Sequence, residues 1–256
     1  MVRTSFTTGE VLVVIITNGD TLPQTDKLIA DVRAEVSNLI GIVQSINTRR
    51  GNAILGSEER TLWGRPYLTE QLENLQLRVS PRSFFQVNPI QTAVLYQKAK
   101  DYAALQGTET VFDLYCGIGT ISLYLSDAAA KIVGVEIVAA AVEDAKESAK
   151  LNGITNVEFH IGAAEEVVPL LYKQGYQADV VLVDPPRKGC DETLLKTMIA
   201  MVPPQIIYIS CNPATLARDL KYLVVNGYSI MEVQPVDMFP HTSHVECVVL
   251  MSKVEK

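Results

Sequence analysis

Cys211 and its neighbours are of types that can perform covalent chemistry. The thiol follows the strand-like run Ile206–Ser210 and precedes Asn212-Pro213, an N-cap residue with proline at the first helical position. The partial positive charge at a helix start favours a thiolate, which is a strong nucleophile. A buried, inert cysteine is the alternative, and we assign that role to Cys247. We therefore predict Cys211 as a catalytic nucleophile.

Glu246 is a carboxylate within an otherwise apolar strand, which we predict over His244–Ser252. Burying an unpaired carboxylate costs free energy, and desolvation raises its pKa. Such a group is prepared for proton transfer, so we predict Glu246 as a base. A solvent-exposed acid is the second interpretation. A metal site of His241, His244 and Cys247 ranks third, because successive strand residues point to opposite faces, and we predict no metal.

Another acid, Asp184, follows the apolar run Val180–Val183 and precedes two prolines and Arg187. Ligands of open α/β sheets bind beyond the carboxyl ends of the strands. The prolines stiffen the backbone and fix the directions of Asp184 and Arg187. We predict Asp184 as a ligand-binding residue, and the alternative is a proline turn that only ends a buried strand.

A glycine-rich turn follows Asp113, and it contains Gly117 and Gly119. Two glycines let the backbone approach a ligand closely, and the following helix start adds positive charge. Ser122 stands where a dinucleotide-binding turn would carry its third glycine, which disfavours NAD. Glu136 ends the next strand, where a carboxylate can accept hydrogen bonds from ribose hydroxyls. These residues favour S-adenosylmethionine as the ligand.

A parallel sheet would bring these residues together, and the pattern from Thr110 onward predicts one. Apolar strands alternate with helices, which is typical of a sheet covered on both faces. We expect strands at 110–115, 131–137, 157–161, 178–184 and 205–211. We expect helices at 138–151, 163–172, 192–201 and 213–225. Two closely spaced strands at 228–235 and 244–252 indicate an antiparallel edge, as in methyl-transferring relatives of the Rossmann fold, so the predicted class is α/β with a Rossmann-like sheet.

The first part of the chain predicts a separate, smaller α/β unit. Its strand-like stretches lie at 10–17, 40–46 and 68–79, and its helix lies at 22–36. Asn88 caps a further helix, with Pro89 at the first position, and this helix runs to about Ala104. We therefore predict a small α/β subdomain over 1–80 and a Rossmann-like catalytic domain over 81–256.

Composition and charge exclude several classes of protein. The chain has 256 residues, of which 48% are hydrophobic and 20% charged, so it is neither disordered nor fibrous. Residues 1–90 carry no net charge and residues 91–256 carry all of the net charge of −7. The larger part is therefore not a basic nucleic-acid surface. For a nucleic-acid substrate, another surface or domain would have to supply most of the phosphate attraction.

Cysteine spacing and hydropathy predict the compartment. The four cysteines, Cys116, Cys190, Cys211 and Cys247, are scattered without a C-x-x-C pair, which argues against a disulfide frame or a cysteine-only metal cluster. The early apolar run Val11–Ile16 is too short to span a bilayer, and there is no secretory signal. We expect a cytoplasmic protein that does not bind membranes.

Five short motifs occur in a fixed order along residues 80–251. They are Phe84-Phe-Gln86-Val-Asn88-Pro89, Asp113-Leu-Tyr-Cys-Gly-Ile-Gly, Asp184-Pro-Pro-Arg-Lys-Gly, Ser210-Cys-Asn-Pro and His244-Val-Glu246-Cys. In this order they resemble the RNA 5-methyluridine methyltransferase family, and in particular its 23S rRNA members. The resemblance implies S-adenosylmethionine as cofactor. It also implies cofactor contacts from Gln86, Tyr115, Glu136 and Asp184, with Cys211 as nucleophile and Glu246 as base.

The implied reaction is methylation of uridine C5 in structured RNA, with rRNA favoured over tRNA. A base inside an RNA helix is out of reach, so the uridine would be flipped out or taken from a loop. The N-terminal RNA-binding barrel and the iron–sulfur cysteines of many family members are not visible in this sequence. We therefore expect the phosphate-binding surface to lie on a missing N-terminal domain. Alternatives are methylation of an exocyclic amine, an inactive cofactor-binding fragment and a nicotinamide dehydrogenase.

Overall fold

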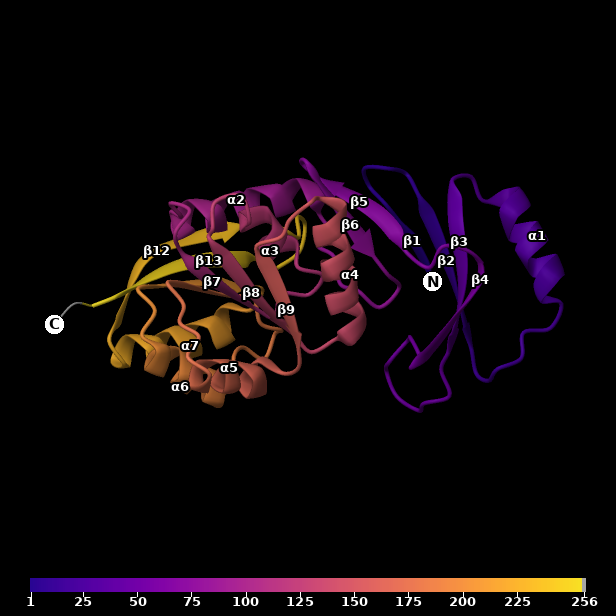
Figure 1. Ribbon diagram of the computed structural model, residues 1–256. Helices are drawn as coiled ribbons and strands as arrows, with labels where there is room; N and C mark the ends of the chain where they lie inside the picture. Colours follow the sequence, from indigo (N-terminus) through magenta and orange to yellow (C-terminus); the bar gives the residue numbers. More distant parts are fainter. Residues whose placement is uncertain (255–256) are drawn as a thin grey trace. The chain divides into compact units, whose positions relative to one another are not determined.

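The computed structural model describes residues 1–254, which divide into two compact units (Figure 1). The first unit is Met1–Phe84, and the second begins at Phe85. None of the helices in the described residues is long and apolar enough to cross a membrane.

The first unit contains a four-stranded sheet and a hairpin. The sheet has the order β1 (Val2–Thr4), β2 (Val11–Thr17), β3 (Leu39–Ile46) and β4 (Glu58–Gly64). Helix α1 (Thr25–Glu35) connects the parallel strands β2 and β3, and the hairpin consists of β5 (Leu68–Leu72) and β6 (Leu75–Val79). Leu12, Val14, Ile42 and Val43 are buried, which gives this unit a core of its own.

Helix α1 and strand β4 of the first unit differ from the expectations. Helix α1 begins at Thr25 rather than at residue 22, because Gln24 adopts a left-handed conformation with φ 53°. Strand β4 was not predicted, because its start is charged and mostly exposed, without an apolar alternation to identify it. Its pairing with β3 is tertiary information that the local pattern lacks.

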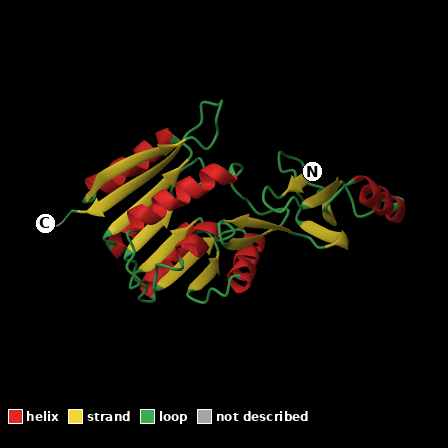
Figure 2. Cartoon of the chain, turned by 90° about the horizontal axis from the view of Figure 1, so that it is seen from above, coloured by secondary structure: helices red, strands yellow, loops and turns green. Residues whose placement is uncertain are grey.

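The second unit is built on a seven-stranded mixed sheet, seen from above in Figure 2. The strands, in the order in which they lie side by side, are β12 (Tyr228–Val236), β13 (Glu246–Lys253), β11 (Gln205–Ser210), β10 (Val180–Val183), β7 (Thr110–Leu114), β8 (Lys131–Glu136) and β9 (Val157–Ile161). Strands β11, β10, β7, β8 and β9 are parallel to one another, and β13 is antiparallel to both of its neighbours. The predicted α/β class and the antiparallel edge are therefore confirmed.

Helices cover both faces of this sheet (Figure 1). One layer contains α2 (Pro89–Ala103), α3 (Thr120–Leu125) and α4 (Ala139–Leu151), and the other contains α5 (Ala164–Lys173), α6 (Glu192–Met201) and α7 (Pro213–Val225). The second layer packs Val168, Leu194 and Leu220 onto Val181 and Tyr208 of the sheet. The buried strands are apolar on both faces for this reason.

Two predicted helix caps are present in the second unit. The side chain of Asn88 accepts a hydrogen bond from the Gln91 amide at 3.2 Å, and that of Asn212 accepts one from the Ala214 amide at 3.1 Å. Each of these asparagines is followed by a proline at the first helical position. The ends of α2 and α7 that face the predicted site are thus defined by local sequence.

The last strand begins later than expected. We predicted it from His244, but β13 starts at Glu246, and a hydrogen bond from the His244 amide to the Thr242 hydroxyl holds the preceding turn. Glu246 is therefore the first residue of the strand rather than an interior one. Because β13 runs antiparallel to β11, its start lies beside the carboxyl end of β11, where Ser210 pairs with Cys247.

Candidate active site

The sheet topology brings Cys211, Asp184 and Glu246 to one edge. Cys211 and Asp184 directly follow the neighbouring parallel strands β11 and β10, and Glu246 opens the antiparallel strand beside β11. Burial, followed by the charge of the Glu246 carboxylate, raises the pKa of both other groups, so the three lie within electrostatic reach of one another. Residues far apart in the sequence thus form one cluster.

Glu246 has the properties of a proton acceptor poised near neutrality. Its side chain is only 3% exposed, although it stands at a strand end, which argues against the solvent-exposed interpretation. Burial raises the pKa of this carboxyl to about 7, and the charge of Arg187 opposes the rise. A base with this pKa is partly ionised at neutral pH and can both accept and release a proton.

The Cys211 thiol is half-buried, and its pKa is raised. Burial is the main cause, and the charges of Glu246 and Asp184 add to it. Arg187 opposes the rise through its charge and a hydrogen bond. The direction differs from our expectation of a thiolate at a helix start, because two carboxylates and desolvation outweigh the helix and the arginine. These surroundings thus favour the thiol over the thiolate.

Asp184 and Asp113 extend the acidic cluster toward the glycine-rich turn. Burial, followed by the charges of Glu246 and Asp113, raises the pKa of Asp184 to about 8. Asp113 is fully buried, which raises its pKa to about 6, and it accepts a hydrogen bond from the Ser122 hydroxyl at 2.5 Å. Three acids with raised pKa values at one sheet edge are typical of a functional site.

Two residues near this cluster were absent from the predicted site. Tyr96 of α2 is buried, and burial followed by the charges of Asp184, Asp113 and Glu246 raises the pKa of its hydroxyl. Arg187 acts on both Cys211 and Glu246. The sequence signal for Arg187 was its place after the two prolines, whereas Tyr96 carries no local signal because only tertiary packing brings α2 over the sheet edge.

The glycines of the turn after β7 have different roles. At Gly117, with φ 57°, an added Cβ would meet no atom within 4 Å, so the backbone borders open space. At Gly119, with φ 72°, it would lie 2.8 Å from the Phe159 ring. Gly117 thus fits the predicted approach of a ligand to the backbone, whereas Gly119 is required by packing against Phe159 as well as by its conformation.

The predicted cofactor residues present polar groups that suit an adenosine ligand. Glu136 accepts hydrogen bonds from the amides of Gly117 and Val138 at 3.1 and 2.8 Å, which fixes its carboxylate at the carboxyl end of β8. Gln86 precedes α2 rather than following a strand, and it is only 7% exposed. Its Oε1 atom is buried with no hydrogen-bond partner among residues 1–254. A buried acceptor of this kind needs a donor, and a bound ligand can supply it.

Tyr115 adopts a left-handed backbone conformation with φ 65°, which is uncommon for a residue other than glycine. It directly follows β7, and burial is the main cause that raises the pKa of its hydroxyl. Strained backbone of this kind tends to occur at ligand sites. The ionisable groups that act on its hydroxyl are Cys190, Glu165 and Asp191, none of which belongs to the acidic cluster, so only its backbone position between Asp113 and Gly117 favours the predicted cofactor contact.

A separate pocket of about 610 Å³ lies beside the loop that follows β10. Its lining includes Lys188, Cys190, Leu195, Arg218 and Tyr222, but none of the predicted site residues. In the described part of the chain, no group of three His, Cys, Asp or Glu side chains is arranged to hold a metal ion.

Similarity to known proteins extends over the whole described chain. The model of the tRNA (uracil-5-)-methyltransferase family matches residues 56–254. An uncharacterized RNA methyltransferase of Bacillus cereus is 54% identical over 256 residues, covering 100% of this chain and 56% of the relative. One from Listeria innocua is 50% identical over 252 residues, covering 98% and 55%. The chain thus spans about half the length of these relatives.

Solved structures show the same similarity. The Pyrococcus abyssi tRNA (uracil-54, C5)-methyltransferase in complex with S-adenosyl-L-homocysteine has a TM-score of 0.80 and 32% identity, covering 98% of this chain and 58% of that one. An M. jannaschii tRNA m1G37 methyltransferase has a TM-score of 0.63 with 15% identity, covering 100% and 72%. The second likeness shows the fold alone.

Proposed function

Because this chain belongs to the tRNA (uracil-5-)-methyltransferase family, we propose that it methylates C5 of uridine in RNA with S-adenosylmethionine as the methyl donor. The observation that carries the proposal is the convergence of Cys211, Glu246 and Asp184 at one sheet edge. The complex of the P. abyssi relative with S-adenosyl-L-homocysteine supports the cofactor. This function requires a nucleophile, a base and a cofactor site in one place.

The proposed cofactor residues are Gln86, Tyr115, Gly117, Gly119, Glu136 and Asp184. The unpartnered Oε1 of Gln86 and the open space at Gly117 support this assignment, and the Glu136 carboxylate retains lone pairs for ribose hydroxyls. Gly119 shapes the turn through its conformation. When bound there, S-adenosylmethionine would supply an electrophilic methyl group.

The proposed roles of Cys211 and Glu246 follow from the chemistry of uracil, whose C5 is a poor nucleophile. Once deprotonated, the Cys211 sulfur forms a bond to C6, and the electron pair of the C5–C6 double bond moves onto the C4 carbonyl as an enolate. C5 would then bond to the methyl carbon of S-adenosylmethionine as the bond from that carbon to sulfur breaks, and S-adenosylhomocysteine would leave. Glu246 removes the C5 proton, the double bond reforms, and the C6–S bond breaks to release the thiolate. Neither residue is consumed.

The proposed substrate is structured RNA. We favour 23S rRNA from the sequence resemblance, and tRNA is the second candidate because the P. abyssi relative is a tRNA (uracil-54, C5)-methyltransferase. Residues 91–256 carry a net charge of −7, so we propose that RNA phosphates are bound mainly elsewhere.

Mass spectrometry of RNA nucleosides tests the proposed function. The chain is incubated with labelled S-adenosylmethionine and with rRNA and tRNA separately, both taken from cells that lack this enzyme. We expect label in 5-methyluridine, and Cys211→Ala is expected to abolish it while leaving cofactor binding nearly intact. Label on an exocyclic amine would favour the alternative target, and binding of NAD in preference to S-adenosylmethionine by calorimetry would favour a dehydrogenase.

A further inference from the structure

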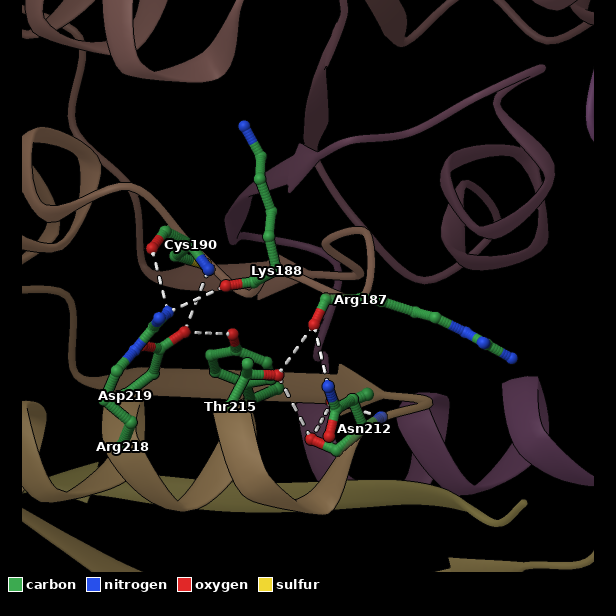
Figure 3. A network of polar contacts seen from close by, with 9 residues as sticks. Arg187, Lys188, Cys190, Asn212, Thr215, Arg218 and Asp219 are labelled. Carbon is green, nitrogen blue, oxygen red and sulfur yellow. Dashed lines mark hydrogen bonds and ion pairs between the residues drawn. The ribbon is translucent and has the colours of Figure 1, made fainter. Parts of the chain in front are cut away.

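The first two turns of α7 hold the loop that follows β10 through its backbone. The side chains of Asn212 and Thr215 both donate to the carbonyl oxygen of Arg187, at 2.9 and 3.1 Å. Figure 3 shows this carbonyl directed at the helix while the Arg187 side chain extends away from it. The helix therefore fixes the backbone of Arg187 and leaves its guanidinium to reach elsewhere.

One turn further along α7, Asp219 holds the other end of the loop. It is fully buried and accepts hydrogen bonds from the Cys190 amide at 2.9 Å and the Tyr208 hydroxyl at 2.6 Å. Arg218 pairs with Asp219 at 2.7 Å and donates to the carbonyl of Lys188 at 2.9 Å. Because Tyr208 belongs to β11, Asp219 joins the loop to the helix and to the sheet at once.

Gly189 shows how closely the loop and the helix approach. Its φ is 77°, and an added Cβ would lie 2.5 Å from Asp219 Oδ2 and 2.6 Å from the Arg218 guanidinium. There is no room for a side chain between the two segments. Residues 187 to 190 are therefore held along their whole length by four side chains of the α7 start, those of Asn212, Thr215, Arg218 and Asp219.

The two segments that are held together carry the charged groups of the site. The loop contributes Asp184 and Arg187, and Cys211 directly precedes Asn212, the N-cap residue of α7. The ionisable groups that act on the Cys211 thiol are Glu246 from β13 and Asp184 and Arg187 from the loop. Among these three groups, Arg187 alone favours the thiolate. Its place relative to Cys211 depends on how the loop is attached.

We propose that Thr215 and Asp219 are positioning residues, which clamp residues 187–190 of the loop to α7 and thereby hold the Arg187 guanidinium beside Cys211 and Glu246. Neither residue is assigned a contact with substrate or cofactor, and both act through Arg187. The catalytic importance of this clamp rests on the proposed function, whereas its effect on the thiol does not. Loss of the clamp should let Arg187 move away and raise the pKa of Cys211.

The rate of Cys211 alkylation measures this effect without RNA or turnover. The folded chain is treated with iodoacetamide from neutral to alkaline pH, and modified peptides are resolved by mass spectrometry. The other cysteines are buried, so Cys211 is the accessible thiol among them. In Thr215→Val, which keeps the shape but removes the donor, we expect alkylation at neutral pH to slow by roughly threefold or more, because only the thiolate reacts.

Three further variants make the test specific. Asp219→Asn should shift the pH profile of Cys211 in the same direction, and Thr215→Ser, which keeps the hydroxyl, should restore the wild-type profile. Thr197→Val is the matched control, because Thr197 donates only to Thr193 within α6 at 2.9 Å. Circular dichroism and thermal unfolding establish that each variant is folded.

The result that overturns the clamp is an unchanged alkylation profile in folded Thr215→Val and Asp219→Asn. Equal slowing in Thr197→Val would also overturn it, because the effect would then be general loosening. Failure of the proposed function gives a different outcome: the wild-type chain would not methylate any RNA, while the alkylation profiles would still differ between Thr215→Val and Thr215→Ser. If the chain does methylate, the maximal rate should fall in Thr215→Val with KM for S-adenosylmethionine unchanged.

Discussion

Glu246 illustrates how a single residue gains its chemistry from its surroundings. In water its carboxyl would be ionised at neutral pH, but burial at the start of β13 raises its pKa to about 7. The opposing charge of Arg187 keeps the value from rising further. The same side chain one position later would point to the other face of the sheet. Its position in the strand therefore decides its function as much as its type.

The first prediction concerns the pH dependence of methyl transfer. If Glu246 is the base, it must be ionised, so the rate should rise with pH through about 7. Ionisation of the Cys211 thiol should extend the rise to higher pH, since its pKa is raised as well. Replacement of Glu246 by Gln should lower the rate by roughly a hundredfold or more, because general bases contribute at least that much.

The control for this prediction is Glu166→Gln, on the exposed surface of α5, which should leave the profile unchanged. Initial rates with saturating cofactor and RNA provide the measurement. A flat profile across neutral pH in the wild type, or a Glu246→Gln enzyme with normal rates, would remove Glu246 from the mechanism.

At the level of elements, the turn between β7 and α3 contains two glycines with different structural roles. Gly119 packs against Phe159, whereas Gly117 borders open space. Both have positive φ, so any other residue would be strained at either position. Only Gly119 also lacks room for a side chain.

The second prediction separates these roles by substitution with alanine. Gly119→Ala should destabilise the fold by about 2–4 kcal/mol, since overpacking adds to backbone strain. Gly117→Ala should cost only about 1 kcal/mol of stability but weaken S-adenosylmethionine binding, because its methyl group would enter the proposed ligand space. Urea unfolding and calorimetry measure the two effects. Equal stability losses, or unaltered cofactor affinity in folded Gly117→Ala, would contradict the assignment.

The elements also show what local sequence can predict. The caps at Asn88 and Asn212 are correct because an N-cap side chain and a following proline act within a few residues. The alternation of apolar strands and helices predicts the α/β fold for a similar reason. The local pattern does not predict the start of β13, because that start depends on the turn held by Thr242. It does not predict strand β4 either, because β4 depends on pairing with β3.

The site is less predictable than the elements. The sequence pattern predicts that Cys211, Asp184 and Glu246 lie at one edge of the sheet, and the strand pairing places them there. This part is predictable because strand order and direction follow from the fold. The raised pKa of Cys211 was not expected, since it results from the carboxylates of two other segments. The approach of Tyr96 from α2 has no sequence signal either. Electrostatics at a site are a tertiary property.

At the scale of the whole molecule, the burial of three acids affects the folding stability. Asp113, Asp184 and Glu246 have pKa values of about 6, 8 and 7, each above its unfolded value, because burial disfavours the charged form. Between the ordinary pKa values of these acids and their raised values, the folded state therefore binds more protons than the unfolded state. Folding stability must fall as pH rises through this range.

The third prediction is the size and origin of that fall. The free energy of unfolding should decrease on the order of 2 kcal/mol or more between about pH 5 and about pH 8.5. In Asp184→Asn the decrease should be smaller, because the group with the highest of the three pKa values no longer titrates. Urea unfolding at several pH values measures it. Stability that is constant or rises over this interval would show that these acids are not buried as described.

The most direct measurement is a covalent trap on RNA that contains 5-fluorouridine at the target position. After Cys211 has added to C6 and C5 has been methylated, Glu246 would find fluorine in place of a proton, and the C6–S bond could not break. We predict a stable, methylated protein–RNA adduct through Cys211 that is lost in Cys211→Ala and depends on S-adenosylmethionine. Methylation of uridine RNA without any such adduct, or an adduct through another residue, would contradict the account.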